Sequence, residues 1–345
     1  MNRLRLLLFF CMLLLPACRA VHFYTQAAAG QWEIMRKAQP LAAVMHSDGG
    51  ATTAVKERLA LVQELRAFAA CELHLPAEKQ YDRYTDLGRE FVVWVVYAAP
   101  EFSVEAKTWW YPLLGHLKYR GYFHEADAQE EAARLRAQGY DVLVGGTEAY
   151  STLGWLRDPV LNTFLHRSDA ELAEVIFHEL THQRLYLQGD TDFNEALATA
   201  AGQAGARQWL RAKGRLADLQ QYERKLRLQR AIIAAILRTR AALQETYARH
   251  AGESAPRLRA LKSAAFTRLH QEAVRLRTAA GLTERHAPSL LNNALLNSVA
   301  AYYSLLPGFE RLLRHGGGSV PAFLQTVEGM KGLSKEARRA QVLTQ

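Results

Sequence analysis

The pattern HExxH occurs at His178, Glu179 and His182. On a helix, side chains four residues apart lie on one face, so His178 and His182 can offer two imidazole nitrogens to one cation. Glu179 then lies beside that cation, where its carboxylate can take a proton from a water that the metal activates. The pattern therefore predicts metal-assisted hydrolysis, with one zinc ion, Zn²⁺, as the cofactor.

A third protein ligand is expected from the segment that follows the histidines. Asp192 is a candidate N-cap for a second helix, and Glu195 falls in the first turn of that helix. A short turn that folds this helix back would bring Glu195 towards His178 and His182, so Glu195 is the predicted third ligand. Asp190 and Asp192 are the alternatives, because the segment GDTD resembles aspartate-using zinc peptidases.

The spacing HExxH is only moderately specific by itself. The chain has 12 histidines, and the pattern should arise by accident in roughly a few per cent of such sequences. Histidines with a purely structural role are therefore the alternative. The context favours metal binding, because Ser168 to Glu171 forms a capping box at the start of the predicted helix and Gly189 is expected to end it.

The N-terminus predicts the compartment. A short basic start precedes the apolar run Leu6–Leu15, which is too short to span a bilayer and is typical of a secretory signal. The segment LPAC resembles a bacterial lipobox, so we expect residues 1–17 to be a lipoprotein signal peptide and Cys18 to carry a lipid anchor. Arg19 favours the outer membrane. The expected location is the bacterial cell envelope, on the periplasmic face of that membrane.

The cysteines indicate what holds the fold together, and the charge indicates which partners to expect. If Cys11 leaves with the signal peptide and Cys18 carries lipid, Cys71 is left without an intramolecular partner, so packing must hold the fold. The formal net charge is +9, but the basic residues are scattered along predicted helices. This distribution is typical of a solvated surface, and no nucleic-acid partner is expected.

The patterns predict a mostly helical α+β protein. We expect an N-terminal helical region at residues 18–88, with helices over 25–45 and 52–74. A catalytic core with a small sheet and the HExxH helix follows at residues 89–214. A C-terminal helical lobe at residues 215–345 should complete the site.

The small sheet is expected before the HExxH helix. The segment Phe91–Tyr97 is β-branched and aromatic, which is typical of a buried strand, and Pro100 should end it. A helix over residues 125–138, capped by Gly139, and a strand over residues 141–146 follow. The order strand, helix, strand predicts a crossover unit.

Another strand is expected over residues 149–155, about two dozen residues before the zinc helix. An edge strand in this place could pair with an extended peptide and hold it across the metal. The alternative is an ordinary sheet strand whose aromatic residues, Tyr150 and Trp155, belong to the core.

The C-terminal region shows long amphipathic patterns over residues 215–250 and 254–279, which predict a helical hairpin that packs as a lid or second lobe. Zinc hydrolases often use a further side chain to donate a hydrogen bond to the tetrahedral oxyanion. Tyr302 is the chosen candidate, and Tyr303 and His286 are alternatives. The charged tail after Ser334 is expected to fray.

Six segments together resemble a zinc aminopeptidase family of bacterial lipoproteins. They are YTQAAAGQ, YPLLGHLKYRGYF, AYSTLGW followed by DPVL, FHELTHQ, FNEALA and LNNALL. The resemblance implies a gluzincin-type metallopeptidase with a zincin-like core and a peptide substrate. It implies that His178, His182 and Glu195 are the ligands and Glu179 is the base.

The chain departs from the expected pattern in two places. Many family members have cysteines near WYPLLGH, where this chain has Trp110 and His116. Thermolysin-like enzymes place an aspartate four residues after the ligand glutamate to orient a histidine, and here that position is Thr199. A different residue must therefore orient the histidine.

The sequence therefore predicts a zinc-dependent metallopeptidase, specifically an aminopeptidase, that hydrolyses peptide bonds with Glu179 as general base. One alternative is a zinc amide hydrolase that acts on cell-envelope peptides. The other is a non-catalytic binding lipoprotein stabilised by a metal. Exopeptidase action would need an acidic group to bind the free amine of the substrate, and the sequence singles out none.

Overall fold

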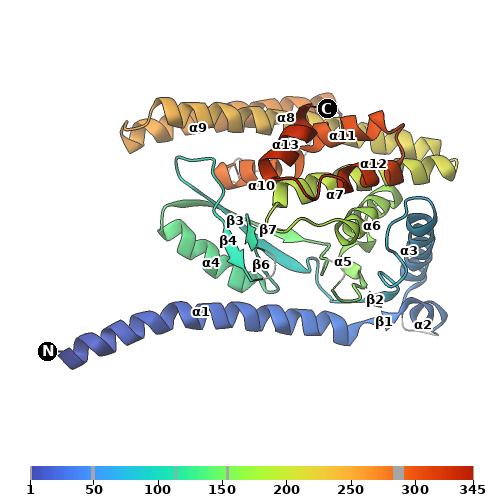
Figure 1. Ribbon diagram of the computed structural model, residues 1–345, viewed down its shortest axis with the longest axis horizontal. Coiled ribbons are helices and arrows are strands. Elements are labelled where there is room, and N and C mark those ends of the chain that lie inside the picture. Colours follow the sequence, from blue (N-terminus) through green and yellow to red (C-terminus); the bar gives the residue numbers. More distant parts are fainter. Residues whose placement is uncertain (1, 48–50, 113–114, 153–154, 283–290, 345) are drawn as a thin grey trace.

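The computed structural model describes residues 2–47, 51–112, 115–152, 155–282 and 291–344, with side chains from residue 20 onward. Helices predominate, and short strands form three small sheets. The sheets lie in a middle layer, the first helix runs below them, and the C-terminal helices lie above (Figure 1). The expected class, α+β and mostly helical, is confirmed.

The N-terminal region consists of three helices and one short strand. They are α1 (Asn2–Lys37), β1 (Gln39–Pro40), α2 (Leu41–His46) and α3 (Thr53–Cys71). Pro40 separates the first two helices, because proline cannot donate a backbone hydrogen bond within a helix. In the described part of the chain, no helix has an apolar stretch long enough to cross a membrane.

One face of α1 packs on the rest of the protein. Phe23, Gln26, Gly30 and Ile34 recur at helical spacing and are buried. Gly30 leaves room for the ring of Phe123, because a Cβ atom at Gly30 would lie 2.0 Å from a ring carbon. The side chain of Gln26 accepts a hydrogen bond from the backbone N–H of Phe123 at 2.9 Å. These contacts hold α1 against the sheet.

The main sheet has the order β6–β3–β7. Strands β6 (Arg120–Tyr122) and β7 (Tyr140–Thr147) both pair antiparallel with β3 (Val93–Pro100) and are therefore parallel to each other. The predicted crossover between the segments 91–97 and 141–146 is wrong, because those segments are antiparallel neighbours. The crossover instead joins β6 to β7, and β6 is too short to show a strand pattern in the sequence.

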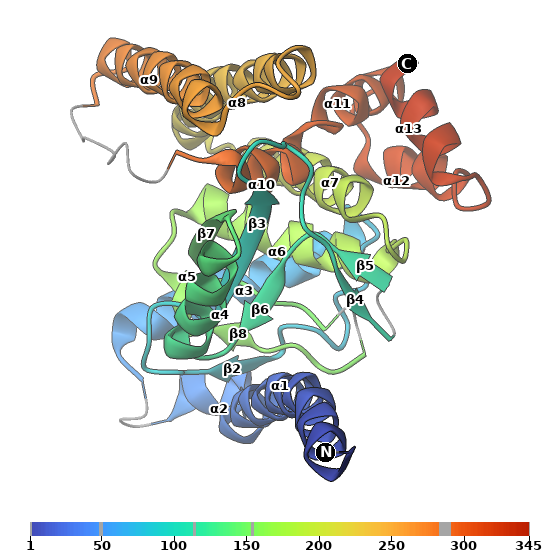
Figure 2. The ribbon, with the colours of Figure 1, turned by 90° about the vertical axis from the view of Figure 1, so that its left-hand side faces the viewer.

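Two helices cover the main sheet. Helix α4 (Glu125–Ala137) connects β6 to β7 and packs against β3 and β7 (Figure 2), and Gly139 follows it with a φ of +83°, as the predicted cap. Helix α10 (Asn293–Tyr303) also packs against β3 and β7. The sheet is therefore packed against one of the C-terminal helices.

Two further sheets are smaller. Strand β2 (Arg83–Thr85) pairs antiparallel with β1 and parallel with β8 (Val160–Leu161). Strands β4 (Trp109–Tyr111) and β5 (Gly115–Leu117) form an antiparallel pair that precedes β6.

The centre of the molecule is a closely packed pair of helices, α6 (Asp169–Arg184) and α7 (Thr191–Ala212), which α5 (Asn162–Leu165) precedes. Almost all of α7 is buried. A Cβ atom at Gly202 would lie 2.7 Å from the carbonyl oxygen of Glu174, and one at Gly205 would lie 2.7 Å from the ring of Phe177. These glycines let the backbones of the two helices approach each other.

The ends of these helices differ from the prediction. Helix α6 stops at Arg184 and does not continue to Gly189. The side chain of Asn194 accepts a hydrogen bond from the backbone N–H of Leu187 and donates one to its carbonyl oxygen, both at 2.8 Å. This clamp turns the chain before α7, so Gly189 serves the turn and Asp190, rather than Asp192, occupies the N-cap position.

The C-terminal lobe begins with the predicted helical hairpin of α8 (Leu216–Arg249) and α9 (Ala255–Ala279). Helices α11 (Leu306–His315), α12 (Val320–Glu328) and α13 (Lys335–Thr344) follow α10. The tail that was expected to fray is thus a helix, and it docks through Arg338, which is 9% exposed.

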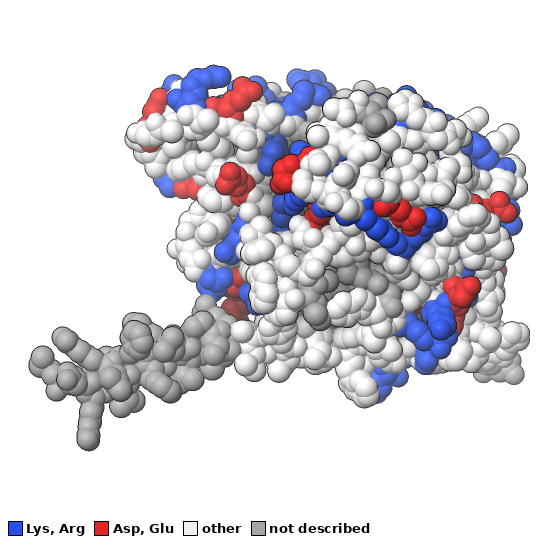
Figure 3. All heavy atoms as spheres, viewed as in Figure 1, with Lys and Arg blue, Asp and Glu red and all other residues white. Residues whose placement is uncertain are grey.

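Charged residues are mixed on the surface. On the face shown in Figure 3, basic side chains lie next to acidic ones. Ion pairs such as Arg238 with Glu272 at 2.7 Å and Arg184 with Glu328 at 3.0 Å link the helices. An exposed pair such as Arg238 with Glu272 contributes little stability, so the packed core must supply most of it.

Replacing Gly202 by Leu should separate α7 from α6, because the glycine has no room for even one carbon atom. We expect Gly202→Leu to lower the free energy of unfolding by about 1–3 kcal/mol. The matched control is Ala212→Leu at the exposed end of the same helix, which should change it by less than about 0.5 kcal/mol. Denaturant unfolding measures both, and equal effects of the two substitutions would contradict the packing argument.

Candidate metal centre

Helix α6 brings the two histidines of the HExxH pattern together. His178 and His182 lie one turn apart, and their Nε2 atoms are 3.1 Å from each other. The His182 side chain is 7% exposed and that of His178 is 17% exposed. Both nitrogens therefore face one point that is largely shielded from solvent.

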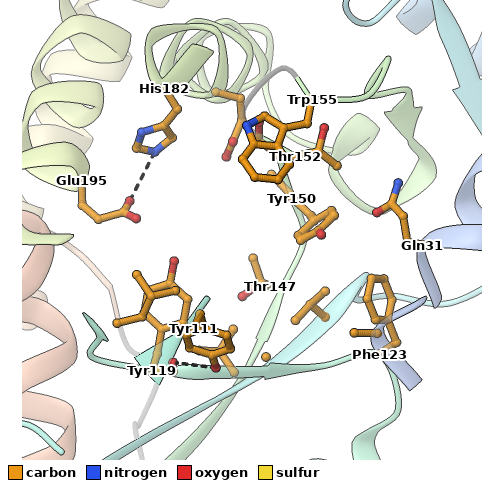
Figure 4. A pocket seen from close by; sticks show the side chains of 18 of the residues that line it. Gln31, Tyr111, Tyr119, Phe123, Thr147, Tyr150, Thr152, Trp155, His182 and Glu195 are labelled. Carbon is orange, nitrogen blue, oxygen red and sulfur yellow. Dashed lines mark hydrogen bonds and ion pairs between the residues drawn. The ribbon is translucent and has the colours of Figure 1, made fainter. Parts of the chain in front are cut away.

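Helix α7 supplies the carboxylate. The Oε2 atom of Glu195 lies 3.5 Å from Nε2 of His178 and 3.6 Å from Nε2 of His182 (Figure 4). Among the described residues, these three side chains form a cluster whose ligand atoms all lie within 4.8 Å of one another. In a tetrahedral zinc site with bonds of about 2.0–2.1 Å, ligand atoms lie about 3.3–3.4 Å apart. The spacing of the three donors therefore fits one small cation.

The charges of the cluster also suit a cation. Burial alone raises the pKa of the Glu195 carboxyl, but His182 and His178 outweigh this effect and hold the pKa at about 2. Burial alone lowers the pKa of His178, but hydrogen bonding to Glu195 and the nearby charge of Glu179 raise it above its usual value. Glu195 is thus held as a carboxylate, which is the form that binds metal.

Glu179 lies beside the cluster and lines the same cavity. Burial is the largest influence on its pKa and raises it, His178 and His182 lower it, and Glu195 raises it again. The net result is a carboxyl whose pKa lies above its usual value. A raised pKa makes a carboxylate a better proton acceptor at neutral pH.

The rival ligands, Asp190 and Asp192, are engaged with cations elsewhere. Arg338 of α13 donates to Asp190 at 2.8 Å, and the Asp190 side chain is 5% exposed. Lys118 donates to both oxygens of Asp192 at 2.7 and 2.8 Å. These two ion pairs hold the start of α7 and thereby position Glu195.

The partner that should orient the second histidine is not found among the described residues. The Nδ1 atom of His182 is buried, and no described residue hydrogen bonds to it. Thr199, which stands where thermolysin-like enzymes have an aspartate, is buried in α7. The ring of Tyr186 packs edge-on against that of His182 with centroids 6.2 Å apart, so packing orients the imidazole.

The structure separates the three oxyanion candidates. The ring of Tyr302 stacks over that of His178, with centroids 6.5 Å apart, and Tyr302 lines the cavity. The hydroxyl of Tyr303 instead accepts a hydrogen bond from Gln229 at 2.8 Å. His286 lies outside the described residues. Tyr302 is therefore the candidate that α10 brings to the metal centre.

Further tyrosines surround the centre, and sequence reasoning missed them. Tyr97, the fifth residue of β3, hydrogen bonds with Tyr302, and Tyr119 precedes β6. Burial and the charge of Glu195 raise the pKa of both phenols, so both stay neutral. Side chains alternate between the two faces of a strand, so the sequence could have indicated that Tyr97 lies on the same face of β3 as Val95. It could not have indicated that this face lies towards the candidate metal ligands.

Tyr81 is a third residue that the sequence did not single out. Its φ of +55° is unusual for a bulky residue, and its hydroxyl is buried without a partner among the described residues. Burial, followed by the charges of Glu179 and Asp158, raises its pKa. Backbone strain of this kind costs about 1–3 kcal/mol and persists only where the surrounding packing enforces it.

A cavity of about 740 Å³ extends from the metal centre to α1. Glu179, His182 and Glu195 line one end, and Gln31 of α1 lines the other. Figure 4 shows Tyr150 and Trp155 on one side between these ends and Tyr111 and Tyr119 on the other. The volume falls within the range of about 300–1,000 Å³ that is usual for ligand sites.

The segment 149–155, which was predicted as an edge strand, is irregular where the structure describes it. The buried carboxylate of Asp158 accepts hydrogen bonds from the backbone N–H of Thr152 at 2.9 Å and from the hydroxyls of Thr152 and Ser151 at 2.7 and 3.1 Å. These bonds curl the segment and replace strand pairing. Its residues still line the cavity.

Glu195→Gln should weaken zinc binding by more than about 100-fold, because it removes the one charged ligand while keeping the size of the side chain. Asp192→Asn should have a much smaller effect, of about tenfold or less, since that carboxylate binds Lys118 and acts only by positioning Glu195. Competition titration against a chromogenic chelator measures both affinities. The ligand assignment fails if Asp192→Asn has the larger effect.

The segments that carry the sequence resemblance all meet at this cavity or its supports. Comparison with protein families gives one match. The family described as "Putative aminopeptidase" matches residues 22–343. No curated protein matches the chain, and no solved structure matches it. Because the match covers nearly the whole chain, the protein belongs to this aminopeptidase family.

Proposed function

We propose that this protein is a zinc-dependent metallopeptidase of zincin-like fold that hydrolyses peptide bonds, with Glu179 as general base. The observation that carries the proposal is the convergence of His178, His182 and Glu195 at one end of a large cavity that Glu179 also lines. Two histidines and one glutamate, with a position left open, form a ligand set typical of catalytic zinc. Family membership supports peptides as the substrate class.

Different residues of the site have different roles in hydrolysis. His178, His182 and Glu195 would hold the ion. A bound zinc ion would lower the pKa of a coordinated water to about 7 and polarise the carbonyl of the substrate. Glu179 accepts the proton of the attacking water and returns it to the leaving amine. The buried surroundings that raise its pKa favour the first of these transfers.

Tyr302 is the proposed donor to the oxyanion. Its hydroxyl stays protonated, because burial raises its pKa well above the usual value. A neutral phenol can donate a hydrogen bond to the oxygen that becomes negative in the transition state. The hydrogen bond to Tyr97 holds the phenol on the cavity side of α10.

We also propose that Cys18 carries a lipid anchor and that the protein lies at the periplasmic face of the outer membrane. The lipobox-like segment LPAC supports this location. Helix α1 continues from Cys18 to Phe23, where it reaches the cavity. Five residues of helix span about 8 Å, so an anchor at Cys18 would keep the cavity near the membrane surface. Mass spectrometry of the mature N-terminus tests the modification.

Glu179→Gln should reduce the rate of peptide hydrolysis by about 10²–10⁴-fold while zinc stays bound, because it removes the proton acceptor and none of the ligands. Chelation should abolish activity in the parent protein, and added zinc should restore it. Mass spectrometry of a peptide library and metal analysis of the purified protein give the two readings.

Other outcomes of this experiment would change the assignment. Cleavage of cell-envelope muropeptides, without cleavage of ordinary peptides, would favour a zinc amide hydrolase. Zinc binding with no turnover of either would overturn the proposal in favour of a binding lipoprotein. Unchanged turnover in Glu179→Gln would contradict the role of the base.

Tyr302→Phe should lower kcat by about 10²–10³-fold with little change in KM, because the hydroxyl acts in the transition state. Tyr303→Phe is the matched control, since the neighbouring hydroxyl binds Gln229 and not the centre. Steady-state kinetics on one peptide substrate compares them. Equal rates for the two variants would assign the oxyanion role to another group.

A further inference from the structure

We infer that the cavity binds a neutral, apolar segment of peptide, several residues long, and that α1 sets how large its side chains can be. This inference rests on the proposed function and names its substrate class. The cavity of about 740 Å³ is far larger than one side chain requires. It therefore has room for a stretch of substrate on one side of the scissile bond.

The wall opposite the metal is one face of α1. Tyr24, Ala27 and Gln31 line the cavity and lie three and four residues apart, so they share a face of the helix. Ala27 is the smallest of the three, and it is half-buried, whereas its neighbours Ala28 and Ala29 are exposed. At Ala27, α1 therefore contributes only a methyl group to the cavity wall.

Gln31 offers a specific contact at this far end. Its carboxamide points into the cavity (Figure 4), and its Oε1 atom is buried with no hydrogen-bond partner among the described residues. A buried acceptor without a donor is unfavourable, so a ligand that supplies an N–H is favoured there. The backbone N–H of an extended peptide is such a donor.

The walls between the two ends are mostly apolar. Phe123 and Tyr150 pack edge-on, with ring centroids 5.7 Å apart, and Val93 and Val95 lie beside them in the cavity lining. In the described part of the chain, the acidic and imidazole side chains that line the cavity all belong to the candidate metal centre. They are His178, Glu179, His182 and Glu195. A charged substrate side chain would lose its hydration here without gaining a counter-ion.

The test compares three pentapeptide amides, Phe-Leu-Phe-Gly-Gly, Ala-Ala-Ala-Gly-Gly and Glu-Lys-Glu-Gly-Gly, each with a free and an acetylated N-terminus. Calorimetry with the zinc-loaded full chain carrying Glu179→Gln measures binding without turnover. We expect the aromatic peptide to bind at least about tenfold more tightly than the other two, because it buries the most apolar surface. Mass spectrometry with the zinc-loaded parent protein measures cleavage of the same peptides.

Variants of α1 test whether the peptide contacts this helix at Ala27 and Gln31. Ala27→Trp, added to Glu179→Gln, should weaken binding of the aromatic peptide by about tenfold or more and leave the alanine peptide nearly unaffected. Ala29→Trp, on the exposed side of the same helix, is the control and should change neither affinity. Gln31→Leu should weaken all three peptides by a similar factor, since it removes an acceptor for the backbone. Thermal unfolding of each variant shows whether it is folded. If Ala27→Trp does not fold, the smaller substitution Ala27→Leu replaces it in the test.

Three results would overturn the inference: similar affinities for the three peptides, tightest binding of the charged one, or equal effects of Ala27→Trp and Ala29→Trp. Aromatic preference in binding, without cleavage by the parent protein, would overturn the proposed function alone. Equal cleavage of all three peptides would overturn the inference alone. The two proposals can therefore fail separately.

Discussion

The close approach of α6 and α7 is the constraint on which the rest of the structure depends. Two histidines on one helix can provide only two ligands, so the third must come from a neighbour. Gly202 and Gly205 remove the side chains that would keep the two backbones apart. The pair can then place Glu195 within 3.6 Å of both imidazoles. A wider helix pair would leave a buried carboxylate without a partner, which is costly.

The register of α7 matters as much as its distance from α6. Asn194 clamps the preceding turn, Arg338 pairs with Asp190, and Lys118 pairs with Asp192. These contacts come from the turn itself, from the C-terminal helix and from the segment before β6. Parts of the chain that are distant in sequence therefore fix which residue of α7 faces the histidines. The C-terminal lobe contributes further through Tyr302 on α10, which joins the sheet to the site.

The six segments that carry the sequence resemblance are related to one another in the structure. Two of them supply the candidate metal ligands, and the segment LNNALL begins α10, the helix that carries Tyr302. The others line the cavity, from Tyr111 and Tyr119 on one side to Tyr150 on the other and Gln31 at the far end. Asp158, next to one of these segments, curls it into the cavity wall. The six segments thus belong to one cavity and the elements around it rather than to several sites.

The sequence alone determined what depends on neighbours along the chain. The spacing of His178 and His182 requires one helix face, and apolar periodicity located the long helices and the two longest strands. Only the tertiary structure brought Glu195, rather than the two aspartates, to the histidines, placed Tyr302 rather than Tyr303 in the cavity lining, and decided which strands pair. It also ended α6 at Arg184 and curled the segment after β7. The first three depend on contacts between residues far apart in sequence, such as Arg338 with Asp190, and local pattern carries no record of such contacts. The last two depend on hydrogen bonds across six or seven residues, Thr152 with Asp158 and Leu187 with Asn194, which apolar periodicity does not mark.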